Sequence, residues 1–228
     1  MNAISHLNIH HSIAADFDKL AHSYENNRLS RWYKASNRIL LKKFPKNGSI
    51  SLLDIGCATG WLLRQTNKEN LIRNGIGIDI SSQMVRAATE AAEREKTLNL
   101  KFINADWEKI ELDKLASKKF DAVICAHTFH YFKNPIRALG KIRSCLNTGG
   151  IFYLVERDTS DSALTRVWGK VHERMMRDQV RFYSEKDLKS MMVKAGFANT
   201  IILKRLKRLF WKNKMSTSLV ILQARNDK

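Results

Sequence analysis

The sequence has little proline, little cysteine and no long apolar run, and each shortage excludes something. Only 2 of the 228 residues are proline, and no stretch rich in glycine and serine separates two halves, so we expect a single domain over residues 1–228. No apolar run approaches the roughly 20 residues that a membrane-spanning helix needs. The N-terminus also lacks the charged-then-apolar layout of a secretion signal, so the sequence predicts a cytoplasmic protein without a transmembrane segment.

The three cysteines, Cys57, Cys125 and Cys145, lack the spacing of a metal site, so we expect buried free thiols and no bound metal. Charge is unbalanced: Lys and Arg number 40 against 22 Asp and Glu, which gives a formal net charge of +18. A basic excess favours anionic partners such as nucleic acid, an acidic membrane surface or an acidic small molecule. The cations are spread through most segments, however, so solvated side chains without a special role explain them equally well.

The stretch 50–60 organises the chain, and it lacks two common nucleotide-binding patterns. The dinucleotide fingerprint would need a glycine at Ala58, and no Gly-Lys-Ser/Thr of a phosphate loop follows. What is present is a short apolar run ending in Asp54, then Gly56 and Gly60 with small residues between them, then a helical pattern. A strand, a tight turn and a helix in this order let a nucleotide-like ligand approach the backbone closely.

Two further acids follow short apolar runs. Asp79 lies near the end of the run 74–80, and Asp106 follows the run 100–104. A carboxylate at the tip of a second parallel strand can accept hydrogen bonds from both hydroxyls of a ribose. Asp106 could equally cap the short helix that we expect after it. Apolar runs at 120–126 and 151–155 continue the alternation of strands and helices, which predicts a parallel, doubly wound α/β sheet with right-handed crossovers.

The last third of the chain departs from this rhythm. Pro135 predicts the start of a helix, and we expect the glycines of 147–150 to cap its end. Residues 157–183 carry an apolar helical stripe with arginines beside it, and we expect a helical insertion there. Residues 200–203 and 218–223 are typical of a closing pair of strands.

These motifs resemble those of the class I S-adenosylmethionine-dependent methyltransferases. Motif I of that family is an apolar run, then Asp or Glu, x-Gly-x-Gly-x-Gly, and here Ala58 replaces the middle glycine. Residues 17–25, FDKLAHSYE, resemble the Phe-Asp-x-x-Ala-x-x-Tyr-Asp segment of small-molecule methyltransferases, with Glu25 in place of the final Asp. Residues 120–132 resemble motif IV. The resemblance runs from Phe17 to the C-terminus, and its cofactor motifs are more specific than its acceptor motifs.

The resemblance implies a Rossmann-like, doubly wound sheet of seven strands, mostly parallel, with an antiparallel last strand. It also implies an N-terminal helical segment at 12–44 and makes the insertion 157–183 part of an acceptor lid. The implied cofactor is S-adenosyl-L-methionine, with Asp79 on the ribose, Asp106 on the adenine amine and Met84 packed on the ring. Tyr24 would close over the cofactor, although Tyr24 could instead belong to a core stripe. The residues expected to bind the cofactor are Tyr24, Asp54, Gly56, Cys57, Ala58, Gly60, Asp79, Ile80, Met84, Asp106, Trp107 and Ala126.

His127 and His130 are the candidate catalytic residues, since the resemblance implies that the fourth strand opens toward the methyl group there. Either imidazole could deprotonate a hydroxyl or amine acceptor. Both could instead only pack or hydrogen-bond, because methyl transfer from a sulfonium needs mainly alignment and desolvation.

The resemblance favours a methyltransferase acting on a small-molecule or lipid-like acceptor, which the net charge suggests is acidic. The Asn/Asp-Pro-Pro-Tyr/Phe signature of nucleic-acid amino methyltransferases is absent, so nucleic acid is a less favoured partner. The alternatives are a nucleic-acid or protein methyltransferase that uses the basic surface, and a non-catalytic binding subunit. The tract 204–214 holds six cations with Phe210 and Trp211. It is either a strand with one solvated face or a peripheral contact with an anionic membrane.

Overall fold

The computed structural model describes residues 13–46, 49–115, 119–160, 167, 169–171, 173–174, 180–206 and 218–227. Its strands form one seven-stranded sheet in the order β3-β2-β1-β4-β5-β7-β6. β2 pairs parallel with β1 and β3, whereas β7 pairs antiparallel with β5 and β6. The expected mostly parallel sheet with an antiparallel last strand is therefore confirmed. The chain divides into two compact units, residues 1–124 and 125–228, and each is described by itself.

The strands of the first unit follow the apolar runs of the sequence. They are β1 (Ile50–Ile55), β2 (Ile72–Asp79), β3 (Leu100–Asn104) and the greater part of β4 (Phe120–Ala126). All six residues of β1 are buried, as expected for an interior parallel strand with no polar face. β1 and β2 run in register from Ser51–Asn74 to Ile55–Ile78, so both strands end at the same level. The loops that follow these strands therefore lie side by side.

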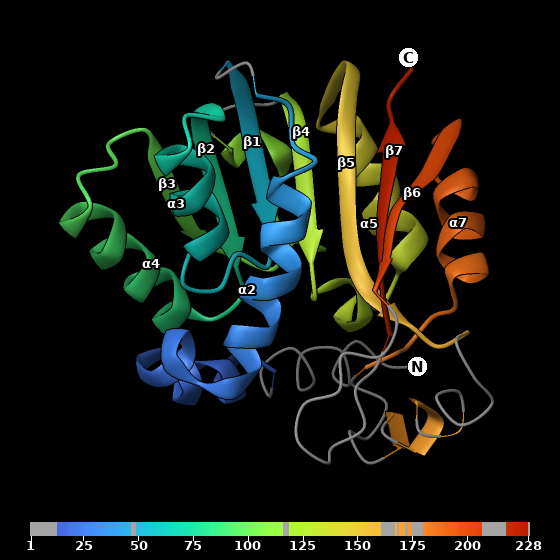
Figure 1. Cartoon of the computed structure of the whole chain (residues 1–228), viewed down its shortest axis with the longest axis horizontal. Coiled ribbons are helices and arrows are strands. Elements are labelled where there is room, and N and C mark those ends of the chain that lie inside the picture. Colours follow the sequence, from blue (N-terminus) through green and yellow to red (C-terminus); the bar gives the residue numbers. More distant parts are fainter. Residues whose placement is uncertain are drawn as a thin grey trace. The chain divides into compact units, whose positions relative to one another are not determined.

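The helices of the first unit pack on its sheet and on one another (Figure 1). A helix at 13–20 leads into the 3-10 helix η1 (Ala21–Asn26) and then α2 (Arg28–Leu41), which Asn27 caps by accepting from the Ser30 N–H. α3 (Trp61–Lys68) packs on β1, β2 and α2, and α4 (Ser82–Arg94) packs on β2, β3 and η1. The chain before β1 is thus helical. Its helix α2 contacts α3, which follows β1, and its helix η1 contacts α4, which follows β2.

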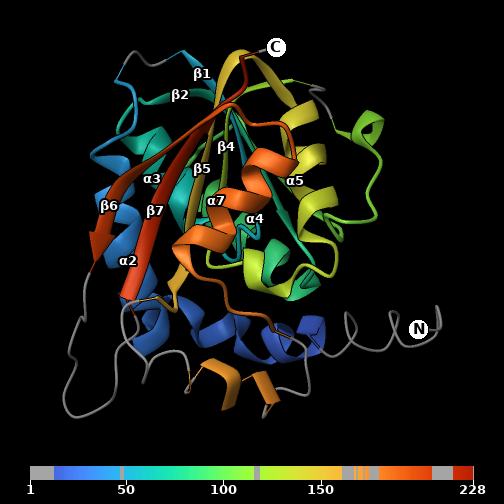
Figure 2. The ribbon, with the colours of Figure 1, turned by 90° about the vertical axis from the view of Figure 1, so that its right-hand side faces the viewer.

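The second unit is built on β5 (Leu146–Asp158), β6 (Asn199–Leu206) and β7 (Ser218–Arg225). The helices α5 (Pro135–Ser144) and α7 (Glu185–Lys194) lie side by side against these strands (Figure 2). Proline at the first position of α5 begins that helix, as the sequence predicts. A capping box between Ser184 and Asp187 begins α7. The apolar residues of β7 are fully buried between its two neighbours.

One expected element is wrong. Residues 147–150 do not cap the preceding helix but belong to β5, and the helix ends at Ser144 with Cys145 as its C-cap. The reason lies far along the chain: Gly149 N–H donates to Asn226 O (2.6 Å), and Asn226 N–H donates to Gly150 O (2.9 Å). Strand pairing with residues beyond β7 therefore overrides the local preference of two glycines to end a helix.

The three cysteines are free and buried, as expected. No helix in the described ranges is both long and apolar enough to cross a bilayer. About half of the insertion 157–183 lies outside the described residues, and so does the tract 204–214 beyond Leu206. Within β6, the Arg205 guanidinium forms a two-point contact with Glu185 at 2.6 and 3.0 Å, which accounts for one cation of that tract.

Candidate functional site

The loop after β1 is held in left-handed backbone conformations. Gly56, Ala58 and Gly60 have φ of 74°, 47° and 72°. The N–H groups of Gly56 and Cys57 both donate to Ile78 O, at 2.8 and 3.0 Å, so β2 supports the turn. At Gly60 a Cβ would lie 2.5 Å from the Phe102 ring, so both the conformation and the space require glycine. Ala58 adopts the left-handed region where the methyltransferase pattern has its middle glycine.

Asp79, the last residue of β2, joins this loop to the next one. Its Oδ2 accepts from the Ala58 N–H at 2.8 Å, and its Oδ1 accepts from the Ser81 N–H at 2.9 Å. The Ile80 N–H also contributes to this carboxylate, whose two oxygens together have about four lone-pair sites, so acceptor capacity remains for a ligand hydroxyl. Burial raises the pKa of Asp79 to about 6, against the opposing effect of these backbone donors, and the nearby charge of Asp18 raises it further.

Asp54 lies in β1 and is 2% exposed. Burial, and then the charge of Asp79, raise its pKa to about 7. The same causes hold the pKa of the Cys57 thiol well above its usual range, so this cysteine is an inert packing residue. Asp54 is buried and Asp79 is half-buried, and both carboxyls have raised pKa values. A cationic ligand beside them would stabilise their ionised forms, because a nearby positive charge favours the ionised carboxylate.

The loop after β3 completes this edge of the first unit. Ala105 N–H donates to Asp79 O (2.9 Å), and the Asn104 side chain donates to Asp79 O and Ile80 O at 3.1 and 2.9 Å. Asp106 Oδ1 accepts from the Glu108 N–H at 2.9 Å within a turn. Residues 107–109 form turns and the next helix begins at Leu112 with Glu111 as its N-cap, so the short helix expected directly after Asp106 is wrong. Trp107 and Met84 are buried, on the loop and on α4. The structure thus brings the ends of β1, β2 and β3 together, and contact of these residues with a cofactor stays a prediction.

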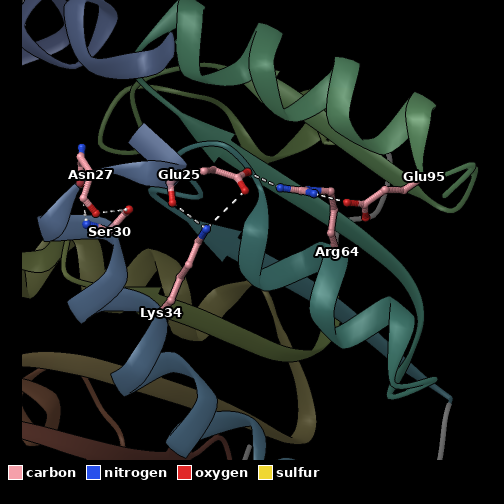
Figure 3. A network of polar contacts seen from close by, with 6 residues as sticks. All are labelled: Glu25, Asn27, Ser30, Lys34, Arg64 and Glu95. Carbon is pink, nitrogen blue, oxygen red and sulfur yellow. Dashed lines mark hydrogen bonds and ion pairs between the residues drawn. The ribbon is translucent and has the colours of Figure 1, made fainter. Parts of the chain in front are cut away.

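Tyr24 lies on η1, and the residue after it takes part in a polar network (Figure 3). The Arg64 guanidinium lies between the carboxylates of Glu25 and Glu95 and forms an ion pair with each. Lys34 Nζ adds contacts with Glu25 O (3.0 Å) and with its carboxylate (3.4 Å). Arg64 is 4% exposed, so it is a buried cation held between two acids.

In the second unit, His130 pairs with a glutamate that sequence reasoning missed. The Nδ1 atom of His130, in the 3-10 helix η3 (Phe129–Tyr131), lies 3.0 Å from both carboxylate oxygens of Glu156. The backbone N–H of His130 also donates to Glu156, at 3.3 Å. The rings of Tyr131 and Phe182 lie 4.2 and 5.6 Å from the imidazole, measured between centroids. The side chain of His130 is therefore fixed in position and buried.

The charge state of this cluster follows from its contacts. Burial opposes ionisation of Glu156, yet the His130 imidazole and the Arg157 N–H hold the pKa of the carboxyl below its ordinary value. Burial lowers the pKa of His127 to about 3, so His127 is neutral at physiological pH and a weak base. His127 has a φ of 58° and donates its N–H to Val155 O at 2.8 Å, directly after Ala126 at the end of β4.

A signal for Glu156 was present in the sequence. It follows the fifth apolar run, just as Asp54, Asp79 and Asp106 lie at or after the earlier ones. Arg64 carries no comparable signal, because its partners are 39 and 31 residues away in the chain. Asn104 was also missed, since a polar residue at a strand end is common.

Comparison with known proteins decides the family. Residues 24–201 match the family model described as a methyltransferase domain. The chain belongs to the class I S-adenosylmethionine-dependent methyltransferases. Malonyl-[acyl-carrier protein] O-methyltransferase of Halalkalibacterium halodurans is 28% identical over 146 residues, which are 61% of this chain and 52% of that protein. Juvenile hormone acid O-methyltransferase of Drosophila melanogaster is 33% identical over 106 residues, 46% of this chain and 35% of that protein.

The chain thus spans about half the length of the first of these relatives and about a third of the second. Among solved structures, the YcgJ protein of Bacillus subtilis superposes with a TM-score of 0.72, at 14% identity, over 86% of this chain and 99% of that one. This likeness shows the methyltransferase fold.

The loops of the first unit fit the cofactor of this family. S-adenosylmethionine carries an ammonium and a sulfonium, and Asp54 and Asp79 provide two carboxyl groups that a cation would favour in their ionised form. Its ribose offers hydroxyls to the remaining lone pairs of Asp79. The glycines leave the backbone of the first loop open to close approach. Asp79 and the loop after β1 would hold the ribose and the amino-acid end, and the loop after β3 would hold the adenine.

Proposed function

We propose that this protein transfers a methyl group to an oxygen atom of a small-molecule or lipid-like acceptor. The observation that carries the proposal is the pair of 3.0 Å contacts between His130 Nδ1 and Glu156. An ionised carboxylate can only accept hydrogen bonds, so Nδ1 carries the proton and donates it to Glu156. The other ring nitrogen, Nε2, then keeps its lone pair in the neutral imidazole. A histidine held in this tautomer by a buried carboxylate is the arrangement of a general base.

The protein has to align the acceptor with the methyl group and remove one proton from the acceptor. S-adenosylmethionine, when bound, supplies a methyl group on a sulfonium, with a neutral thioether as leaving group. The acceptor hydroxyl loses its proton to His130 Nε2 as its oxygen takes up the methyl group. Glu156 stabilises the imidazolium that results and keeps the ring oriented, without itself accepting the proton. General base catalysis of this kind contributes about 10²- to 10⁴-fold.

A carboxylic acid is the second candidate acceptor. The relatives are named for O-methylation of malonyl-[acyl-carrier protein] and of juvenile hormone acid. A carboxylate is already ionised at neutral pH and needs no base, so in that case the His130–Glu156 pair would orient the acceptor or support η3. The net charge of +18 agrees with an acidic acceptor. Both candidates are small molecules, and both place the reaction on oxygen.

The wider alternatives predicted from the sequence concern the class of acceptor, a membrane contact and the location of the protein. A nucleic-acid or protein acceptor, a membrane contact through 204–214 and a cytoplasmic location are predictions that the described residues do not address. Polyanion binding would weaken steeply as salt rises, whereas a small pocket would respond little.

The test is an acceptor screen with isotopically labelled S-adenosylmethionine, read by mass, on a metabolite extract and on defined hydroxy and carboxylic acceptors. The proposal expects methyl esters or methyl ethers of small molecules. Label on nucleic acid or on an amino-acid side chain of a protein instead, or none on any acceptor despite cofactor binding, would contradict it.

The variant His130→Gln distinguishes the two oxygen acceptors. Turnover of a hydroxyl acceptor should fall about 10²-fold or more, because the base is lost. Turnover of a carboxylate acceptor should change little. Cofactor affinity, measured by calorimetry, should be unchanged in either case.

A further inference from the structure

The N-terminal residues 13–26, here called the strap, are attached to the first unit by the contacts of two acids as well as by helix packing. Its buried apolar side chains are few: Ile13 and Ala21 are buried, whereas Leu20 is 38% exposed. Short segments with little apolar burial belong to the least stable parts of a protein and open locally. The polar contacts of the strap therefore contribute much of the free energy that holds it in place.

The first polar contact is made by Asp18. Its Oδ1 accepts from the Ser81 hydroxyl at 2.6 Å and from the Gln83 N–H at 3.1 Å, at the beginning of α4. Ser81 also donates its N–H to Asp79 Oδ1, so Asp18 and Asp79 hold the same serine. The charge of Asp18 raises the pKa of Asp79, which means that the two carboxylates repel one another. The strap is thus attached directly beside the acid expected to bind the ribose.

The second polar contact is made by Glu25, the residue after Tyr24. Its carboxylate forms ion pairs with Arg64 and Lys34 (Figure 3). Arg64 also pairs with Glu95, beyond the end of α4. Loss of Glu25 would therefore not leave the buried guanidinium without a partner, because Glu95 stays in place. This second acid makes opening of the strap far less costly than exposing a lone buried cation would be.

Lys34 contacts both Glu25 of the strap and the neighbouring helix α3. Its ammonium lies 5.6 Å from the centre of the Trp61 ring, and the Arg38 guanidinium lies 5.3 Å from the same ring. Trp61 is the first residue after the loop that follows β1. Glu25 therefore contacts α3 in two ways: directly at Arg64, and through Lys34 at Trp61. These two residues of α3 lie one helical turn apart, in the helix that directly follows that loop.

We infer that Asp18 and Glu25 are positioning residues for the cofactor: they latch the strap, and with it Tyr24, over the loops after β1 and β2. The ammonium group, which S-adenosylmethionine and S-adenosylhomocysteine share, offsets the repulsion between Asp18 and Asp79, so binding favours the latched strap. The latched strap in turn slows release of the ligand. Closure and binding are coupled by the same free energy in both directions. The inference rests on the family's cofactor and not on the identity of the acceptor.

Limited proteolysis of the full-length wild-type protein tests the coupling without any variant. Lys19 is an exposed trypsin site within the helix 13–20, and cleavage there requires local opening of the strap. Addition of S-adenosylhomocysteine or S-adenosylmethionine at saturation should slow cleavage after Lys19 at least about tenfold, which corresponds to a coupling of about 1.4 kcal/mol. Equal cleavage rates with and without ligand would overturn the inference.

The variants Asp18→Asn and Glu25→Gln test the latches themselves. Each should raise the dissociation rate constant of S-adenosylhomocysteine, followed by stopped-flow fluorescence, about tenfold, since the charged acceptor is replaced by a weaker neutral one. Glu25→Asp, which keeps the charge, should restore part of the effect. Glu90→Gln is the matched control, because Glu90 pairs with Arg86 on the exposed face of α4 at 2.9 Å and touches no part of the strap.

In the double variant the strap should be cleaved rapidly with and without ligand, while the melting temperature stays near that of Glu90→Gln. Wild-type dissociation rates in both single variants would overturn the latch. So would a drop in melting temperature with unchanged ligand protection, because the two acids would then serve the fold and not the strap. Failure of every acceptor in the screen above would leave these binding measurements unaffected.

Discussion

Asp79 Oδ2 accepts a hydrogen bond from the backbone N–H of Ala58 at 2.8 Å. This contact links the end of β2 to the middle of the loop after β1, at the one position where the chain departs from the motif I glycine pattern. Ala58 reaches a φ of 47°, a conformation that costs an L-residue about 1–2 kcal/mol. The hydrogen bond to Asp79 offsets that cost. The acid thus shapes the loop as well as offering lone pairs to a ligand.

Replacement of Asp79 should weaken cofactor binding through both roles. Asp79→Ala removes the acceptor for the ribose and the support of Ala58, and calorimetry should show a loss of ~1–3 kcal/mol in binding free energy. Asp79→Asn keeps one acceptor oxygen and should lose less. An unchanged affinity in Asp79→Ala would show that the ribose is held elsewhere.

Gly60→Ala tests the steric requirement of the loop after β1. The new Cβ would lie 2.5 Å from the Phe102 ring at a φ of 72°, so urea denaturation should show a loss of at least ~1–2 kcal/mol. Gly140→Ala is the control, because no described atom other than those of its neighbours and of the α5 backbone lies within 4 Å of the corresponding Cβ. That helical site should gain up to about 1 kcal/mol. Equal effects at the two glycines would argue against the loop geometry.

Stability without cofactor should depend on pH through Asp54 and Asp79. Their folded pKa values of about 7 and about 6 lie above the ordinary value, so the folded state binds protons more tightly than the unfolded chain. Their contribution is fully present below about pH 4 and is lost as the pH rises through 6 to 7. Thermal melts at pH 5 and pH 8 should show a smaller decrease in Asp54→Asn than in the wild type. An equal decrease in the two proteins would mean that Asp54 does not titrate in this range and that its carboxyl is ionised throughout.

Cofactor affinity should change with pH in the opposite sense. A cationic ligand binds the ionised carboxylates, so its affinity should rise between pH 5 and pH 8 as protons are released. Calorimetry in buffers of different ionisation enthalpy measures that proton release directly. In Asp54→Asn the release should be smaller, and an identical value would exclude Asp54 as its source.

Glu156→Gln should reverse the tautomer of His130. The amide can donate to Nδ1, which moves the ring proton to Nε2 and removes the base. With a hydroxyl acceptor, kcat should fall about 10²- to 10⁴-fold, while the Kd for the cofactor stays constant. Glu90→Gln again serves as the control. A kcat within a few-fold of the wild type with that acceptor would exclude His130 as its general base.

The sequence was sufficient for the first three strands and the acids at their ends, because each signal there is local. Apolar runs, glycines and strand-end acids lie within a few residues of one another, and the sheet aligns them. What sequence reasoning could not supply are contacts between distant segments. Arg64 needs Glu25 and Glu95, and the start of β5 needs Asn226. Local preference at Gly149 and Gly150 indicated a helix end, and long-range pairing overrode it.

The position of β7 between β5 and β6 has a consequence for synthesis of the chain. β7 follows both neighbours in the sequence, yet β6 pairs with β7 along Asn199–Arg225 to Leu206–Leu219, and β5 pairs with its other side. On the ribosome, β6 therefore emerges before β7, the strand with which it pairs. Until β7 is synthesised, the edge of β5 that pairs with β7 is also unpaired. Unpaired strand edges invite association between nascent chains. The interval between synthesis of β6 and of β7 is thus the period in which this protein is most exposed to aggregation.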